Sequence, residues 1–188
     1  MKRVILLLSL SLSIAACGQK PAVDEENASV EEVADKVRQV SQDEGFVRPG
    51  KWVSTVTIED VAMPGLPAEA AEQVKKQMVA QTQSTTSCLT PEQAKKPEPG
   101  FFARGDNCRY DHFTMGHGKI DAQMRCSQGA MAQVMQMTGT YSPDAYAMRM
   151  TSSARGGPAA EGNMAMKMKV EAKRVGECAD EADKPKEN

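Results

Sequence analysis

The sequence is poor in the residues that most often mark an active site. Its 188 residues include only two histidines, His112 and His117, and aromatic residues make up 4% of the chain. His117 stands between two glycines at an expected turn, and His112 alternates with Phe113 and Met115, so that it should face water. Neither histidine has a serine or cysteine nearby in the setting of a nucleophile. We therefore expect no enzyme and assign no catalytic residue.

Motifs for metals, cofactors and nucleic acids are missing as well. The chain has no C-x-x-C pair and no cluster of cysteine with histidine, which argues against a zinc site and against thioredoxin-like chemistry. Gly156-Gly157-Pro158 is not followed by the Lys-Ser/Thr start of a helix, which excludes a phosphate-binding loop. A formal net charge of −2 gives no reason to expect nucleic acid. We expect no cofactor, no metal site and no nucleic-acid partner.

The N-terminal segment has the order of an export signal. Lys2 and Arg3 precede an apolar run, Val4 to Ile14, that is broken only by serines. The run is too short to span a bilayer, which needs roughly 20 apolar residues, and it fits a secretory signal that is removed. The string Ile14-Ala15-Ala16-Cys17 resembles the lipobox of bacterial lipoproteins. This resemblance implies cleavage before Cys17, a diacylglycerol on its sulfur and a further acyl chain on its amine.

The residue after the lipobox cysteine indicates in which membrane a lipoprotein is anchored. In Gram-negative lipoproteins an Asp at this place usually retains the protein at the inner membrane, and here it is Gly18. The resemblance thus implies a lipid-anchored, palmitate-bearing protein on the periplasmic face of the outer membrane. Because stable anchoring needs about two chains, a triply acylated cysteine should stay in the membrane. The alternative is an ordinary cleaved signal with a cysteine nearby by chance.

The other four cysteines predict disulfide bonds. An even number in an exported chain is typical of a disulfide framework, because the periplasm is oxidising. Four cysteines allow three pairings, and we favour Cys88–Cys108 and Cys126–Cys178. The first would close the loop between its two cysteines, and the second would tie the last strand to a middle one.

The chain divides into four expected regions. These are a signal peptide over 1–16, a lipidated tether over 17–45, a disulfide-stapled antiparallel β domain over 46–179, and a disordered charged tail over 180–188. Valines recur at helical spacing within the tether, which indicates a short amphipathic helix. A solvated spacer between membrane and domain is the alternative.

The domain is expected to be mainly β, with a minor α part. Alternating residues from Trp52 onward predict a strand, and strong helix formers predict a helix at about residues 67–80. Thr90 before Pro91 indicates the start of a short helix after a second strand. The second half alternates throughout and has short turns. We therefore expect an antiparallel meander covered in part by one helix.

Several short motifs are similar to those of a known family. They are Pro49-Gly50-x-Trp52, Cys88-Leu89-Thr90, Cys108, Cys126, the turn GTYSPDAY and a closing Gly176-x-Cys178. Over about residues 48–179 the chain resembles a domain-of-unknown-function family of small exported proteins and lipoproteins of Gram-negative bacteria. The resemblance implies export and this fold, and it adds no catalytic residue.

Methionine is the unusual abundance, with 13 residues. Because strand side chains alternate, seven methionines are expected on one face of the sheet while Lys167 and Lys169 point to water on the other. The seven are Met135, Met137, Met148, Met150, Met164, Met166 and Met168. They could fill a core, line an adaptable apolar groove for a lipid or peptide, or bind a soft metal such as Cu(I). The helix at 67–80 is the expected cover, through Ala70, Val74 and Met78.

These observations favour a non-enzymatic lipoprotein that binds an apolar ligand or an envelope protein. One alternative is a structural or stress-related envelope protein without a small-molecule site. A further alternative is a periplasmic protein that binds copper through methionine and histidine. An apolar cavity open to solvent would favour the first over the second.

Overall fold

The structure is a computed structural model that describes residues 22–44, 46–95, 107–156 and 163–178. The expected signal peptide, Cys17 and the expected tail over 180–188 lie outside the described residues. The described elements are, in chain order, β1 Val23–Ser29, α1 Val30–Glu44, β2 Gly50–Ala62, α2 Ala68–Val79, β3 Thr82–Leu89, α3 Pro91–Lys95, β4 Cys108–Gly116, β5 Lys119–Gln128, β6 Met131–Ser142, β7 Ala145–Arg155 and β8 Met164–Gly176.

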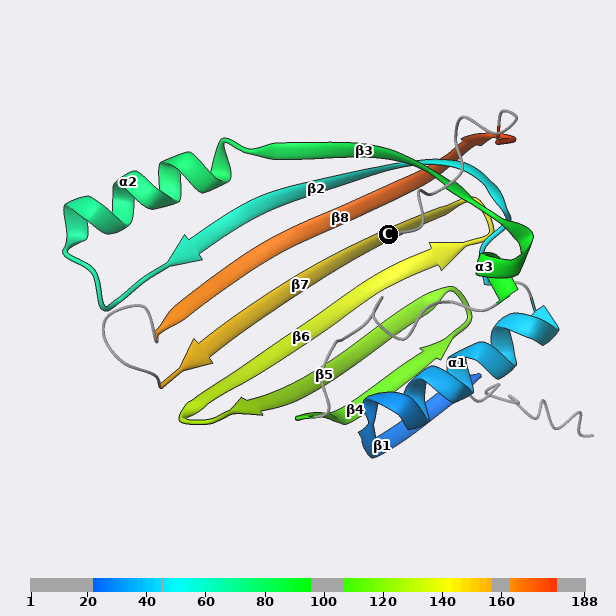
Figure 1. Ribbon diagram of the computed structural model, residues 1–188, viewed down its shortest axis with the longest axis horizontal. Helices are drawn as coiled ribbons and strands as arrows, with labels where there is room; N and C mark the ends of the chain where they lie inside the picture. Colours follow the sequence, from blue (N-terminus) through cyan, green and yellow to red (C-terminus); the bar gives the residue numbers. More distant parts are fainter. Residues whose placement is uncertain (1–21, 45, 96–106, 157–162, 179–188) are drawn as a thin grey trace, which may run out of the picture.

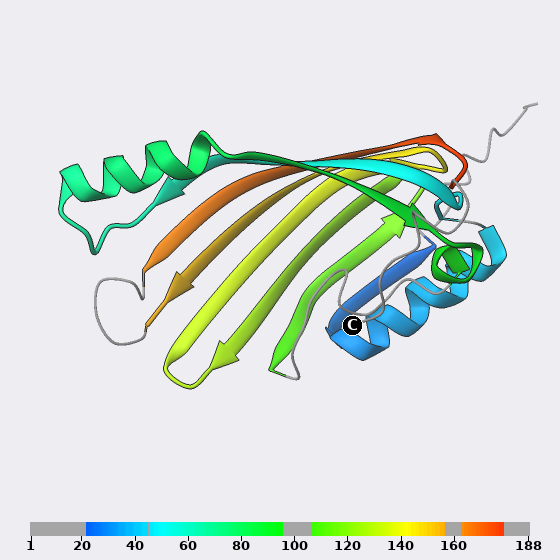
Figure 2. The ribbon, with the colours of Figure 1, turned by 45° about the horizontal axis from the view of Figure 1, so that its top comes forward.

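The strands form one eight-stranded sheet with the order β1-β4-β5-β6-β7-β8-β2-β3 (Figure 1). Every neighbouring pair is antiparallel. From β4 to β8 the strands follow one another as the expected meander, so the mainly β prediction is confirmed. The β2–β3 pair lies beside β8 and β1 lies beside β4. Figure 2 shows that the long strands are strongly twisted and bent. β2 and β4 each contain a shift of register of the kind that a β-bulge produces, and β-bulges bend a strand and increase its twist.

The segment expected as a tether is built into the domain. β1 pairs with β4 along its length, and α1 packs on the sheet beside it. Val23, Val30, Val33 and Val37 belong to the main core cluster. The expected amphipathic helix is present as α1, but its valines are buried against the sheet. β1 and α1 therefore belong to the domain that was expected to begin at residue 46.

A capping box explains where α1 begins. The Ser29 hydroxyl accepts a hydrogen bond from the Glu32 backbone N–H at 3.2 Å, and a Glu32 carboxylate oxygen accepts one from the Ser29 backbone N–H at 2.7 Å. Two backbone donors at the start of the helix are thus satisfied. The bond from the Ser29 backbone lowers the pKa of Glu32, and the bond from its hydroxyl lowers it further. One face of α1 is then free to bury its valines.

The core lies between α1 and one face of the sheet, which we call the inner face. Its largest fully buried side chains are Phe113 and Met115 of β4 with Val33 and Val37 of α1. Each such apolar side chain contributes about 1.5–3 kcal/mol relative to an exposed one. The core continues across β5 to Met137 of β6 and Met148 of β7, and other members are Val23, Ala28, Val30, Cys108, Tyr110, Ile120, Ala122 and Met124.

The helix expected to cover the methionines lies elsewhere. α2 spans Ala68–Val79, close to the expected 67–80, and its half-buried stripe includes the expected Ala70, Val74 and Met78. It has no buried residue, and it lies beside the end of β2 at the margin of the sheet (Figure 1). The helix that packs on the core is instead α1, at the opposite side of the sheet beside β1 and β4, so the expectation that 67–80 covers the methionines is wrong.

All four described cysteines form disulfide bonds, but both expected pairings are wrong. The bonds are Cys88–Cys178 and Cys108–Cys126. Cys108 and Cys126 stand directly opposite each other on β4 and β5. Cys88 is the next-to-last residue of β3 and Cys178 follows β8, and β2 separates these two strands. The sheet order therefore decides the pairing.

Candidate functional site

The register places all seven predicted methionines on the inner face. Met137 of β6 is opposite Met150 of β7, and Met150 is opposite Met168 of β8. Met135 is opposite the buried Met124, and Met148 is next to Gly139. A β-carbon at Gly139 would stand 2.8 Å from Cγ of Met148, so glycine leaves the space that this methionine fills. Met164 and Met166 continue the same face at the start of β8.

The lysines of β8 take the other face, as expected. Lys167 is exposed and Lys169 is half-buried, and they alternate with Met166 and Met168. Lys169 forms an ion pair of 2.8 Å with Glu171 on this outer face. The opposite register would bury the ammonium groups without partners, at a cost of several kcal/mol. The predicted register of β8 is confirmed.

The inner face is covered unevenly. Met137 and Met148 are buried, with exposed fractions of 9% and 8%, and belong to the core cluster that also holds Val33 and Val37 of α1. Met135, Met150, Met166 and Met168 are half-buried, and Met164 is exposed. We call these last five residues the open methionine patch. Figures 1 and 2 show no described helix over the part of β6, β7 and β8 that carries them.

The two ends of the sheet differ. At the end where β2 begins and β8 finishes, α3 contacts α1, so elements from opposite edges of the sheet meet. Aromatic pairs fill this end: the rings of Phe46 and Tyr141 are 4.5 Å apart and those of Trp52 and Tyr146 are 5.9 Å apart. The other end carries Met131 and Met164, both exposed. The inner face is therefore closed at one end and open at the other.

A cavity of about 760 Å³ lies at this open end, between α2 and the ends of β2, β7 and β8. Its walls are largely apolar, with a few charged groups. An ion pair of 2.9 Å joins Lys75 of α2 to Asp60 of β2, and the hydrogen bond between them lowers the pKa of Asp60 and raises that of Lys75. Met164 lines the cavity and also belongs to the open methionine patch. The cavity also has outer-face residues in its lining, namely Asp60, Ser153 and Ala165, so it wraps the end of the sheet and meets the open methionine patch at Met164.

A second cavity, of about 590 Å³, lies near the closed end of the sheet. It is lined in part by outer-face residues, among them Val53 of β2 and Lys173 of β8. Tyr141 and Tyr146 also line it, and their rings take part in the aromatic pairs described above. This cavity is separate from the open methionine patch.

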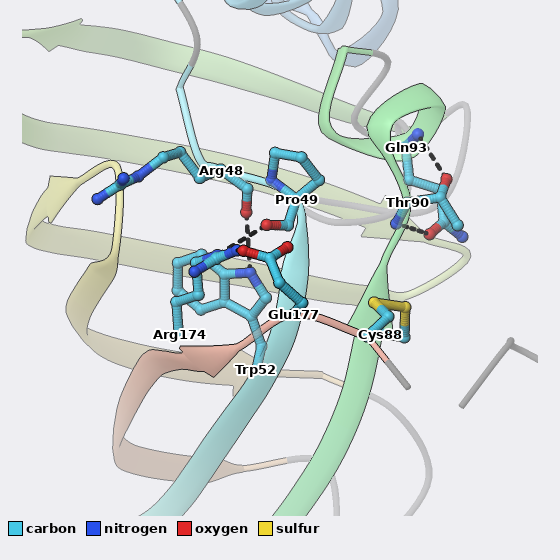
Figure 3. The surroundings of a disulfide bond; sticks show 9 residues. Arg48, Pro49, Trp52, Cys88, Thr90, Gln93, Arg174 and Glu177 are labelled. Carbon is cyan, nitrogen blue, oxygen red and sulfur yellow. Dashed lines mark hydrogen bonds and ion pairs between the residues drawn. A yellow bond between two sulfur atoms is a disulfide. The ribbon is translucent and has the colours of Figure 1, made fainter. Parts of the chain in front are cut away.

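Residues of two family motifs, Pro49-Gly50-x-Trp52 and Cys88-Leu89-Thr90, lie at one corner beside Arg174 near the end of β8, shown in Figure 3. Arg174 donates a hydrogen bond of 2.7 Å from Nε to the carbonyl oxygen of Pro49, and Trp52 donates one of 3.0 Å from Nε1 to that of Arg48. Gly50 has φ +138°, and a β-carbon there would lie 2.5 Å from the Gly176 carbonyl oxygen. These motif residues thus join the start of β2 to the end of β8. Their role is structural, and the part of Arg174 was not apparent from the sequence.

The remaining sequence candidates do not gather into a reactive site. His112 lies 2.6 Å from Asp121 through Nε2, and His117 occupies a tight turn with φ +51°. The four cysteines named above are bonded and cannot act as nucleophiles. Among the described residues, no three His, Cys, Asp or Glu side chains are placed to hold a metal ion. Within the same residues, no helix is both long and apolar enough to cross a membrane.

Comparison with known proteins gives a family without a known activity. The model of a family described as "Protein of unknown function (DUF3617)" matches residues 47–178. Searches of curated proteins and of solved structures give no match. The family match begins after α1, so β1 and α1 lie outside it while they cover the core of the matched region.

Proposed function

The chain belongs to the DUF3617 family, and from this premise we propose that it is a non-enzymatic, lipid-anchored binding module whose open methionine patch takes an apolar ligand. The observation that carries the proposal is the partial cover of the inner face. A closed core would bury its methionines, whereas five of the seven are half-buried or exposed here. Flexible thioethers suit a surface that adapts to variable apolar partners.

The neighbouring cavity supports this proposal. Ligand pockets are commonly apolar, with few polar groups that fix orientation, and enclose roughly 300–1,000 Å³. The cavity at the open end, of about 760 Å³, has a volume within this range, and it shares Met164 with the patch. In this proposal a ligand with a hydrocarbon part lies on the patch and reaches the cavity at Met164.

The proposal of a binding module also follows from the chemistry of the inner face. An enzyme needs an acid, a base or a nucleophile placed against its substrate. The patch itself consists of thioether side chains alone, and in the cavity beside it Asp60 and Lys75 form an ion pair with each other. This composition supports binding rather than bond-making chemistry.

A fluorescent fatty acid tests the ligand site. Wild-type protein should bind the probe and raise its emission, and Met166→Asp should weaken binding at least about tenfold because a carboxylate would enter the apolar surface. The matched control is Thr151→Asp, which introduces the same charge on the opposite face of β7, beside Lys167. Circular dichroism should show both variants folded. Equal probe binding by wild type and Met166→Asp would contradict the proposal, as would unfolding of Met166→Asp, which would mean that the patch is closed core.

The proposed location has a separate test. We propose that Cys17 is acylated and that the protein faces the periplasm from the outer membrane, on the resemblance of Ile14-Ala15-Ala16-Cys17 to a lipobox. Intact-mass measurement of protein purified from membranes should show the loss of residues 1–16 and the added acyl mass. Cys17→Ser should leave an unlipidated precursor. A free thiol on Cys17 in the wild-type protein would contradict this part of the proposal and leave the ligand site untouched.

The same preparation tests the copper alternative. Cu(I) titration should leave the methionine resonances of the patch unmoved if apolar ligands are the natural occupants. Lipids extracted from the purified protein and identified by mass spectrometry should then include a molecule in stoichiometric amount. Stoichiometric copper binding that Met168→Leu abolishes would favour the metal function instead.

A further inference from the structure

The two edges of the sheet are built differently. β1, at one edge, carries Asp24, Glu25 and Glu26 and contains Asn27 at φ +47°. Acidic side chains and a kinked backbone are typical means of preventing an edge strand from pairing with another chain. β3, at the other edge, has the sequence TQSTTSCL, without a charge, a proline or a positive φ angle. Only the β1 edge is therefore protected against pairing.

The β3 edge is open along most of its length. Its first six residues, Thr82 to Ser87, are exposed, and β2 is the only described strand that pairs with it. Half of the backbone N–H and C=O groups of an edge strand point away from the sheet, where they can hydrogen-bond to an added strand. The rest of this margin is occupied differently, because α2 lies against the end of β2 and pairs Lys75 with Asp60. The open edge thus coincides with β3 itself.

β3 is also held firmly in place. Its last residues lead into α3, where Thr90 and Gln93 cap one another with hydrogen bonds of 3.0 and 3.2 Å. The disulfide from Cys88 to Cys178 fixes this end of β3 to the end of β8 (Figure 3). A strand that is already ordered loses less conformational entropy when another strand pairs with it.

We propose that β3 is a homodimer interface, at which β3 of a second copy adds antiparallel to form one continuous sheet. Identical antiparallel strands are related by a two-fold axis perpendicular to the sheet, so both copies keep their inner faces on the same side. Opposite residues must then belong to the same face, which requires their numbers to sum to an even value. The register centred on Thr85 meets this condition and places Ser84 opposite Thr86 and Gln83 opposite Ser87 of the partner. Each of these pairs is neutral and joins groups that can hydrogen-bond.

The neutrality of β3 favours a second copy over other occupants. Self-pairing of β1 would set its three adjacent carboxylates against those of its partner, whereas self-pairing of β3 sets no charge against a like charge. Hydroxyl and amide side chains on both faces can form cross-strand hydrogen bonds with an identical strand. The self-complementarity that a two-fold interface needs is thus present in β3 and absent from β1.

Charge reversal at β3 tests the dimer. The full chain, purified in detergent, should show a concentration-dependent dimer by sedimentation velocity. The double variants S84K/T86K and S84E/T86E each place like charges opposite one another, so the dissociation constant should rise at least about tenfold. An equal mixture of the two variants should restore the dimer as a heterodimer. The matched control T138K/T140K adds the same charges to exposed positions of the central strand β6 and should dimerise like wild type.

Three outcomes would overturn the proposal. They are a wild-type monomer at every concentration up to about 1 mM, a dimer that the β3 variants leave unchanged, and variant monomers that do not associate when mixed. The first would leave the edge open to an extended segment of a different protein, and the last would show that Ser84 and Thr86 of two copies do not face each other. Hydrogen exchange gives a readout without mutation, because amides of residues 82–87 should exchange at least about tenfold more slowly as the wild-type concentration rises. Concentration-independent exchange would equally contradict the dimer.

Discussion

Met137 and Met150 stand directly opposite each other on β6 and β7, yet Met137 is buried and Met150 is only half-buried. The boundary of the core therefore passes between two neighbouring residues of the same type. Met137 belongs to the core cluster that also holds Val33 and Val37 of α1, whereas from Met150 the inner face continues to Met168 and the open end. One chemical surface thus serves both as core and as the proposed binding surface.

Because of this boundary, the same substitution should lower the free energy of unfolding by different amounts at Met137 and at Met168. Met137→Ala should lower the free energy of unfolding by about 2–5 kcal/mol, because it removes a buried side chain and leaves a cavity. Met168→Ala should cost about 1 kcal/mol or less, because water already reaches this side chain. Urea denaturation followed by circular dichroism measures both. Equal costs would mean that the open methionine patch is covered in solution.

Tyr110 provides a prediction for alkaline pH. Its ring packs edge-on against Phe113, and its buried hydroxyl has no hydrogen-bond partner among the described residues. Burial raises the pKa of Tyr110 to about 12, whereas an unfolded chain releases this proton near the ordinary value of 10. The unfolded state thus gains by ionisation between these two values, and stability should fall as the pH rises through them. Two pKa units correspond to roughly 3 kcal/mol.

Tyr110→Phe isolates this contribution from the other groups that titrate at alkaline pH. The variant should be more stable by roughly 1 kcal/mol at pH 7, because a buried hydroxyl without a partner is removed. The stability difference between variant and wild type should widen from pH 10 to pH 12. A variant that is less stable at neutral pH would show that the Tyr110 hydroxyl has a partner in solution.

Local alternation in the sequence was enough to predict the strands of the second half. Met166 and Met168 alternate with Lys167 and Lys169. Because the side chains of a strand alternate between two faces, the strand must turn its methionines to the inner face and its lysines to water. The helix near residues 67–80 was predictable for the same reason, since propensity and spacing are local properties. What these patterns could not show is which neighbour each element meets, because a stripe of Val74 and Met78 fits any apolar surface.

The errors all concern contacts between distant parts of the chain. The disulfide from Cys88 to Cys178 depends on β2 lying between β3 and β8, which no spacing in the sequence indicates. The segment before residue 46 resembled a charged spacer because its acidic residues outnumber its valines, and the buried face of α1 is visible only against β4. The structural role of Arg174 likewise needs the approach of Pro49, which is distant in the sequence.

The two disulfides should differ in their effect on stability. Chain-entropy arguments give about 3 kcal/mol for a short closed loop and nearly 5 kcal/mol for a loop of about 100 residues. The Cys88–Cys178 bond spans 90 residues and Cys108–Cys126 spans 18. The double variant C88S/C178S should therefore lose more stability in urea than C108S/C126S. Peptide mapping without reductant should recover these two linkages, and a peptide that links Cys88 to Cys108 would contradict the structure.

The last prediction concerns the dependence of the family domain on the segment before it. Val33 and Val37 of α1 are each 1% exposed and rest on the inner face, whereas Gln39 of the same helix is exposed. Val33→Asp should cost several kcal/mol, because an unpaired carboxylate would be buried against the sheet. Gln39→Asp adds the same charge at an exposed position of α1 and should change stability by less than about 0.5 kcal/mol.

Removal of β1 and α1 should have a still larger effect. The family match starts at residue 47, so a fragment over 47–178 would retain the matched region but lose the cover of Phe113 and Met115. Such a fragment should bind an apolar dye strongly and show weak near-ultraviolet circular dichroism, as expected when an apolar face is left bare. A synthetic peptide of residues 22–44, added in excess, should reverse both signals by pairing with β4. A fragment that is monomeric, dye-free and as stable as the full chain would show that α1 is dispensable for the core.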